Sequence, residues 1–124
     1  MVNKIVISIS LIVLVVFAIY FYQEYQVKRI EINEIDLASI NNGVYKGSYE
    51  TMLVSATLQV KITEHQIVDI KIINHDNSRG EKAECIVNDV KDKQSLNVDV
   101  ITGATASSKV ILKAIETALW SGIK

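Results

Sequence analysis

The stretch Leu58-Gln-Val-Lys-Ile-Thr-Glu-His-Gln-Ile-Val-Asp-Ile-Lys-Ile72 decides the fold. Apolar and polar residues alternate on both sides of a short break, with Leu58, Val60 and Ile62 before it and Val68, Ile70 and Ile72 after it. A period of two is typical of a strand that buries one face. The stretch therefore predicts an antiparallel hairpin with one face toward a core.

The connection between these two strands is Glu64-His65-Gln66, which contains no glycine. A short hairpin loop usually requires a residue with positive φ, and His is one of the few other side chains enriched there. We therefore interpret His65 as a loop residue rather than a catalytic one.

A third strand is expected upstream, after the turn signal Asn42-Gly43. Tyr45, Gly47 and Tyr49 share one face of this strand, and Val44, Lys46 and Ser48 share the other. Gly47 has no side chain, so another backbone can approach the strand closely at that position.

Two helices are expected downstream, because the apolar spacing changes to that of a helix. The first covers Glu81 to Lys93, and the second covers Ser107 to Ser121, with Lys109, Lys113, Glu116 and Thr117 on its outer face and Trp120 over the edge of the core. Val98 to Ile101 is expected to form a further short strand. The predicted fold class is α+β, a small antiparallel sheet from Val44 to Asn74 packed by helices.

The N-terminal part is different in character. After a short flank of residues 1–4, residues 5–22 contain no charge, Gly or Pro. As a helix they would span about 27 Å, close to the ~30 Å of a hydrocarbon core. We expect one transmembrane helix over 5–22, a linker over 23–41 and one domain over 42–124. A cleavable signal peptide is the alternative, although no small-residue cleavage site follows the apolar run.

The charges lie almost entirely outside this segment, since Lys4 is the only charged residue among the first 22. The whole chain has a net charge of -1, so residues 23–124 carry -2. Without a basic excess, a grip on a phosphate backbone is not expected, which argues against a nucleic-acid binder. A single cysteine, Cys85, and the adjacent pair His75-Asp76 are weak signals for redox or metal chemistry.

The stretch Asn97-Val-Asp-Val-Ile-Thr-Gly-Ala-Thr-Ala-Ser-Ser108 is predicted to form a strand, a tight turn and a helix N-terminus capped by Ser107 or Ser108. Free backbone N–H groups and hydroxyls at a helix N-terminus suit a phosphate, which Lys109 or Lys113 would help to neutralise. Plain helix capping explains the same residues. The stretch lacks the spacing of a Walker loop or a dinucleotide fingerprint.

Residues 99–108 resemble the flavinylation motif of the FMN-binding domain family, Asp-x-x-(Ser/Thr)-Gly-Ala-Thr-x-(Ser/Thr). This family includes the C subunit of the sodium-translocating NADH:quinone oxidoreductase and the G subunit of the Rnf complex. Gly43 to Gly47, Ile67 to Ile72, Gln94-Ser95 and Lys113 to Leu119 also match the family pattern, so the resemblance covers about residues 42–119. His65 and Asn42 depart from it, both in turns.

The resemblance implies that a flavin transferase joins the phosphate of FMN through a phosphoester to Thr105. Residues of the surrounding motif would lie around the phosphate: Thr102, Gly103, Ala104, Ser107 and Ser108. Asp99 matches the acidic position, and because a carboxylate repels phosphate, it is expected to orient the turn or to act with a metal during transfer. We expect no resident metal site and no catalytic dyad.

The expected function is that of a membrane-anchored electron carrier rather than a self-sufficient enzyme, since FMN accepts one or two electrons. Its partners would be a membrane oxidoreductase or quinone-linked donor and an acceptor outside the cytoplasm. The related proteins imply a single-pass protein of the cell membrane with its domain on the extracytoplasmic side. The alternatives are a flavin-free, membrane-tethered interaction module of the same fold and an enzyme that reduces a small substrate by itself.

Overall fold

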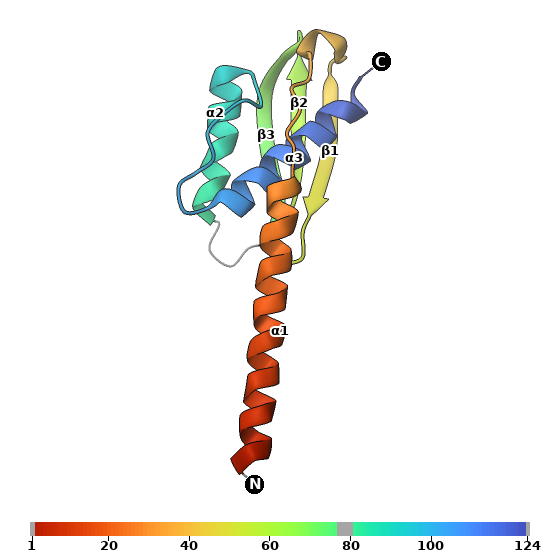
Figure 1. Ribbon diagram of the computed structural model, residues 1–124. Coiled ribbons are helices and arrows are strands. Elements are labelled where there is room, and N and C mark those ends of the chain that lie inside the picture. Colours follow the sequence, from red (N-terminus) through yellow and green to blue (C-terminus); the bar gives the residue numbers. More distant parts are fainter. Residues whose placement is uncertain (1, 77–80, 124) are drawn as a thin grey trace.

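The computed structural model describes residues 2–76 and 81–123, and it shows an α+β domain at the end of one long helix (Figure 1). The helices are α1 (Val2–Arg29), α2 (Ile86–Lys93) and α3 (Thr105–Ser121), with short 3-10 helices η1 (Leu37–Ser39) and η2 (Glu81–Cys85). The strands are β1 (Gly43–Glu50), β2 (Ser55–Thr63) and β3 (Gln66–Asp76). The predicted fold class is confirmed.

The three strands form one antiparallel sheet in the order β1-β2-β3. Leu58, Val60 and Ile62 of β2 are buried, as their alternation predicts. Glu64 and His65 form the two-residue turn before β3, with φ of 52° and 63°. Positive φ at both central residues is the type I′ geometry, so the interpretation of His65 as a loop residue is confirmed.

The register of β3 differs from the expectation at Val68. This residue was expected on the buried face, but it is 46% exposed, and Ile67 is buried in its place. The pairing passes from Ile62–Ile67 to Lys61–Asp69, so Val68 is an extra residue in a β-bulge. A second shift, between Leu58–Ile72 and Thr57–Asn74, leaves Ile73 exposed in the same way.

Helix α3 packs closely against β1 at Gly47. A Cβ atom built on Gly47 would lie 2.2 Å from the carbonyl oxygen of Ala114 and 2.5 Å from the amide nitrogen of Ala118. No side chain fits there without moving one backbone away from the other. The close approach expected from the sequence is therefore present, and α3 is the helix that makes it.

The other side of α3 is covered by the chain that follows α1 (Figure 1). Ile30, Ile35 and Ile40 of this chain belong to the hydrophobic core. Residues 23–41, expected to be a linker, thus pack on the domain. As a result Glu116, expected on an outer face, is only 3% exposed. Trp120 differs in the opposite sense: it is 59% exposed, and the residue buried beside Gly122 at that end of α3 is Ile40.

The loop between α2 and α3 does not contain the expected strand. Residues 97–101 have no regular secondary structure and pair with none of the described strands. The backbone N–H and C=O of Ile67 on β3 instead bind the side-chain amide of Gln94, at 2.7 and 2.8 Å. Gln94 occupies part of the sheet edge that a fourth strand would use.

The helical spacing downstream predicts an apolar stripe of Ala83, Ile86, Val87 and Val90 across η2 and α2. Ala83, Ile86 and Val90 are buried, Val87 is half-buried, and Cys85, off the stripe, is exposed. The first turns of the predicted helix are 3-10, so the α-helix begins at Ile86 rather than Glu81. Helix α1 extends away from the domain as one helix (Figure 1). Its residues Asn3–Arg29 are long and apolar enough to cross a membrane.

Candidate functional site

The site begins with a tight turn between the loop that follows α2 and the start of α3. The amide of Ala104 donates a 2.9 Å hydrogen bond to the carbonyl of Ile101 across Thr102 and Gly103. Gly103 has a φ of 80°, which side-chain-bearing residues rarely adopt. A positive φ at the third position is the geometry of a type II turn. The predicted tight turn is thus confirmed, and glycine is the residue that permits it.

The hydroxyl of Ser108 fastens this turn to the first turn of α3. It accepts a 3.0 Å hydrogen bond from the amide of Ile101 and donates a 2.7 Å bond to the carbonyl of Ala104. Ser108 is fully buried. Its buried hydroxyl therefore links the first residue of the turn to the last.

Helix α3 begins at Thr105, not at Ser107 or Ser108, so the expected N-cap is wrong. Ala104 is the N-cap residue, and no side chain caps the helix there. Ser108 can instead bond back to Ala104 because it lies inside the helix, four residues further on. Alanine is among the poor N-cap residues, so the first amides of α3 lack the side-chain acceptor that helices usually have.

The residues of the motif divide into an exposed and a buried group. Asp99, Thr102, Gly103 and Thr105 are exposed, whereas Ala104, Ser107 and Ser108 are buried. Thr105 is the exposed first residue of α3, so it lies at the end of the helix where the amides are uncapped. The structure therefore gathers the predicted residues at one turn and presents Thr105 on its surface.

A hollow of about 380 Å³ lies along the next turn of α3. Its lining combines three parts of the chain: Ile32 and Glu34, the loop residues Leu96, Asn97, Val98 and Val100, and Lys109 and Leu112 of α3. Lys109 is four residues beyond Thr105, which places it one helical turn away on the same face. The hollow thus combines apolar side chains with one ammonium group, from Lys109, and one carboxylate, from Glu34, one helical turn from the exposed threonine.

Glu34 fixes the wall of this hollow. Its carboxylate accepts hydrogen bonds from the Ser95 hydroxyl, at 2.9 and 2.8 Å, and from the Leu96 amide at 2.9 Å. Sequence reasoning missed Glu34 and Ile32 because they lie in the segment taken as a linker. The isoleucines spaced along that segment, Ile30, Ile32 and Ile35, were the available signal that it packs on the domain.

The two candidate lysines have different surroundings. Lys113 donates to the carbonyl of Glu31 at 2.9 Å and pairs with the Glu116 carboxylate. Lys109 lines the hollow, and its ammonium lies 3.5 Å from the carbonyl of Val27. Of the two, Lys109 is the one placed to face a ligand.

A second hollow on the other side of the loop is acidic. It measures about 530 Å³ and is lined by Asp89, Asp92, Lys93, Val98 and Asp99. Three carboxylates around one recess disfavour a phosphate there. Within residues 2–76 and 81–123, no group of three or more His, Cys, Asp or Glu is placed to hold a metal ion.

The histidines and the cysteine lie away from the hollow beside Thr105. His65 Nδ1 lies 3.2 Å from the carbonyl of Ile40, and His75 Nδ1 lies 3.4 Å from the Glu84 carboxylate. Cys85 is an exposed free thiol. None of these three residues lines the hollow beside Thr105.

The chain was compared with curated proteins and with models of protein families. No curated protein matches the chain. The family model described as the FMN-binding domain matches residues 54–120, which is more than half of the 124 residues and includes the turn, Thr105 and nearly all of α3. The chain therefore belongs to the FMN-binding domain family and is an FMN-binding protein.

Proposed function

We propose that this protein is a membrane-anchored electron carrier whose FMN is attached through a phosphoester to Thr105. The observation that carries the proposal is the start of α3 at an exposed threonine behind an alanine N-cap. A phosphate on the Thr105 hydroxyl would supply acceptor oxygens to the uncapped amides, and the positive end of the helix dipole favours its charge.

The residues around Thr105 fit a covalently held phosphate. Exposed Gly103 leaves the backbone accessible, and Thr102 is a second exposed threonine in the same turn. Ser108, buried and bonded on both sides, keeps the turn in one conformation. Ser107 packs beside it, and exposed Asp99 is assigned to orienting the loop or assisting transfer rather than to binding the mature phosphate.

The hollow beside Thr105 would hold the flavin ring. Leu96, Val98, Val100 and Leu112 offer apolar surface, and the Lys109 ammonium would favour a reduced, anionic flavin. FMN supplies the capacity to accept one or two electrons, while the protein orients it and tunes its potential. An open recess that leaves one side of the ring accessible suits exchange with partner proteins better than enclosed substrate chemistry.

The anchoring part of the proposal is supported by the continuity of α1. The helix runs through the end of the apolar stretch without a break, and Gln23 and Val27, just beyond it, are buried against the domain. Removal of the apolar stretch as a signal peptide would require cleavage within this packed helix. An anchor agrees better with the packing.

The anchor would keep the flavin close to the bilayer. Val27 is five residues beyond Tyr22, or about 7.5 Å along a helix. Lys109 contacts the Val27 carbonyl, and Thr105 is one turn from Lys109. A membrane oxidoreductase or quinone-linked donor would therefore be within reach, with the acceptor outside the cytoplasm, the side on which the family's flavin transferase works.

The proposal can be tested by coexpressing the full chain with a flavin transferase. Purified protein should be yellow and should keep its fluorescence on a denaturing gel, and it should stay in the membrane pellet after alkaline carbonate extraction. A colourless chain in the pellet would support the flavin-free interaction module instead. Flavin that leaves the chain on denaturation would refute the covalent bond.

A further inference from the structure

The turn between β1 and β2, residues 51–54, carries two exposed apolar side chains. Met52 is 54% exposed and Leu53 is 50% exposed. The turn is closed on itself: the Thr51 amide donates to the Val54 carbonyl at 2.7 Å, and the Val54 amide donates to the Thr51 hydroxyl at 3.3 Å. Val54 is buried in the hydrophobic core and holds the turn to the domain, while Met52 and Leu53 face outward.

This turn is tied directly to α1. The Met52 amide donates to the Gln26 side-chain oxygen at 2.9 Å, and the Leu53 amide donates to that of Gln23 at 3.0 Å. Gln23 is 6% exposed, so this contact is packed as well as bonded. The turn thus has a defined position along the helix.

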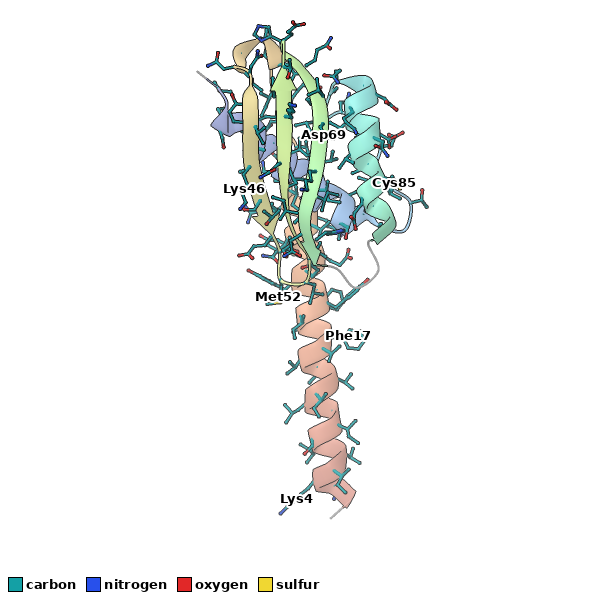
Figure 2. All side chains as sticks on the ribbon, turned by 180° about the vertical axis from the view of Figure 1, so that it is seen from behind. Lys4, Phe17, Lys46, Met52, Asp69 and Cys85 are labelled. Atoms are coloured by element: carbon teal, nitrogen blue, oxygen red, sulfur yellow. The ribbon has the colours of Figure 1, made fainter. Side chains whose placement is uncertain are left out.

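That position coincides with the end of the apolar stretch. Gln23 immediately follows Tyr20, Phe21 and Tyr22, whose aromatic rings suit the boundary between lipid and water. Figure 2 shows Met52 at the end of the sheet nearest the exposed part of α1, with Phe17 further along the helix. The headgroup layer on each side of a bilayer is about 5–7 Å thick, so a turn bonded to Gln23 lies within it when residues 5–22 span the hydrocarbon core.

Basic and aromatic side chains of α1 lie at the same level. The Arg29 guanidinium stacks over the Tyr25 ring at 5.5 Å and donates to its hydroxyl at 3.0 Å. Tyr25 is exposed, and Lys28 and Arg29 end the helix. Glu24 and Glu50 add opposite charge, so the apolar pair, rather than a net charge, distinguishes this surface.

We infer that the turn 51–54 inserts Met52 and Leu53 into the headgroup boundary of the bilayer that α1 crosses. The occupant of this apolar surface is the lipid itself, because the turn is hydrogen-bonded to Gln23 and Gln26, which directly follow the apolar stretch of α1. Together the helix and the turn give the domain two contacts with the membrane. Two contacts fix the tilt of the domain relative to the membrane plane, and therefore the distance of Thr105 from the bilayer. A single flexible tether would leave both free.

The inference rests on the anchoring part of the proposed function, and a site-specific probe can separate the two. In the full chain with Cys85→Ser, an environment-sensitive dye is placed on Met52→Cys or Leu53→Cys. Val68→Cys is the matched control, because Val68 is also an exposed apolar residue but lies in the bulge near the opposite end of the sheet. The labelled proteins are incorporated in phosphatidylcholine vesicles and recovered by flotation.

At Met52 and Leu53 we expect the emission maximum of the dye to shift to shorter wavelength. The dye should also become less accessible to iodide, and spin-labelled lipid added to the vesicles should quench it. The dye at Val68 should show none of these changes. Equal iodide quenching at all three positions in floating vesicles would overturn the insertion while leaving the anchor intact. Protection from iodide without quenching by lipid would overturn it too, because a second protein surface would then cover the turn. Failure to float would refute the anchor and the insertion together.

Discussion

The amide of Ile101 donates a 3.0 Å hydrogen bond to the hydroxyl of Ser108, across the turn that carries Gly103 and Thr105. The same hydroxyl donates to the carbonyl of Ala104, so one buried side chain joins the loop before the turn, the turn and the helix. The position of Thr105 thus depends on a residue that is itself inaccessible to a ligand.

Ser108→Ala should destabilise the domain and slow flavin attachment. The substitution leaves the half-buried Ile101 amide without its acceptor, and the loss of such a hydrogen bond costs about 1 kcal/mol. Urea unfolding of the full chain in detergent should show the loss. Thr117→Ala, on the exposed side of α3, removes another hydroxyl that bonds to the helix backbone and should change stability little. Equal effects of the two variants would contradict the role given to Ser108.

Gly103→Val should impair the turn through backbone strain alone. A β-branched residue at a φ of 80° is strained by about 1–2 kcal/mol or more, whereas asparagine tolerates this region better. The rate at which a flavin transferase loads the chain should therefore fall in the order glycine, asparagine, valine. Unchanged loading of Gly103→Val would show that the transferase does not require the turn seen in the structure.

The hairpin and the turn were predictable because their determinants are local. Alternation in β2 reports the buried face, and the absence of glycine in the loop points to His65. Gly103 and the small residues beside it likewise indicate a tight turn. The predicted start of α3 was wrong because serine is a common N-cap residue, whereas Ser108 lies inside the helix and its hydroxyl donates to the carbonyl of Ala104.

Other features depend on contacts distant in sequence. The bulge at Val68 is a property of strand pairing, which the alternation of β3 alone does not reveal. Gln94 takes the edge of β3, so residues 98–101 stay unpaired despite their strand-like composition. Glu116 has the helical spacing of a surface residue, but the chain around Asn33, which is distant in sequence, packs over it and buries it.

Glu116→Gln should loosen the chain that follows α1. The buried Glu116 carboxylate accepts from the Asn33 amide and pairs with Lys113. Replacing the carboxylate by a neutral amide weakens the charge-assisted hydrogen bond to Asn33 and the pair with Lys113, which is 23% exposed, at a cost of about 1–2 kcal/mol. Limited proteolysis should then cut near residues 31–36, while Glu50→Gln, at an exposed site, should leave this segment protected. Resistance equal to that of the parent protein would rule out this role of Glu116.

Lys109→Gln should lower the midpoint potential of the flavin. Loss of about 1 kcal/mol of favourable interaction with a reduced, anionic ring corresponds to about 20 mV for a two-electron couple. Lys46→Gln, on the exposed face of β1, serves as the control. A spectroelectrochemical titration that gives the same potential for both variants would place the ring outside the hollow lined by Lys109.

The central claim, a flavin phosphoester on Thr105, is tested most directly by peptide mass spectrometry of the chain coexpressed with a flavin transferase. The peptide containing Thr105 should carry the mass of FMN. Thr102→Ala, which changes the other exposed threonine of the turn, should keep the modification on Thr105, and Thr105→Ala should lose it entirely. An FMN increment that survives Thr105→Ala, or that maps to another residue, would contradict the account.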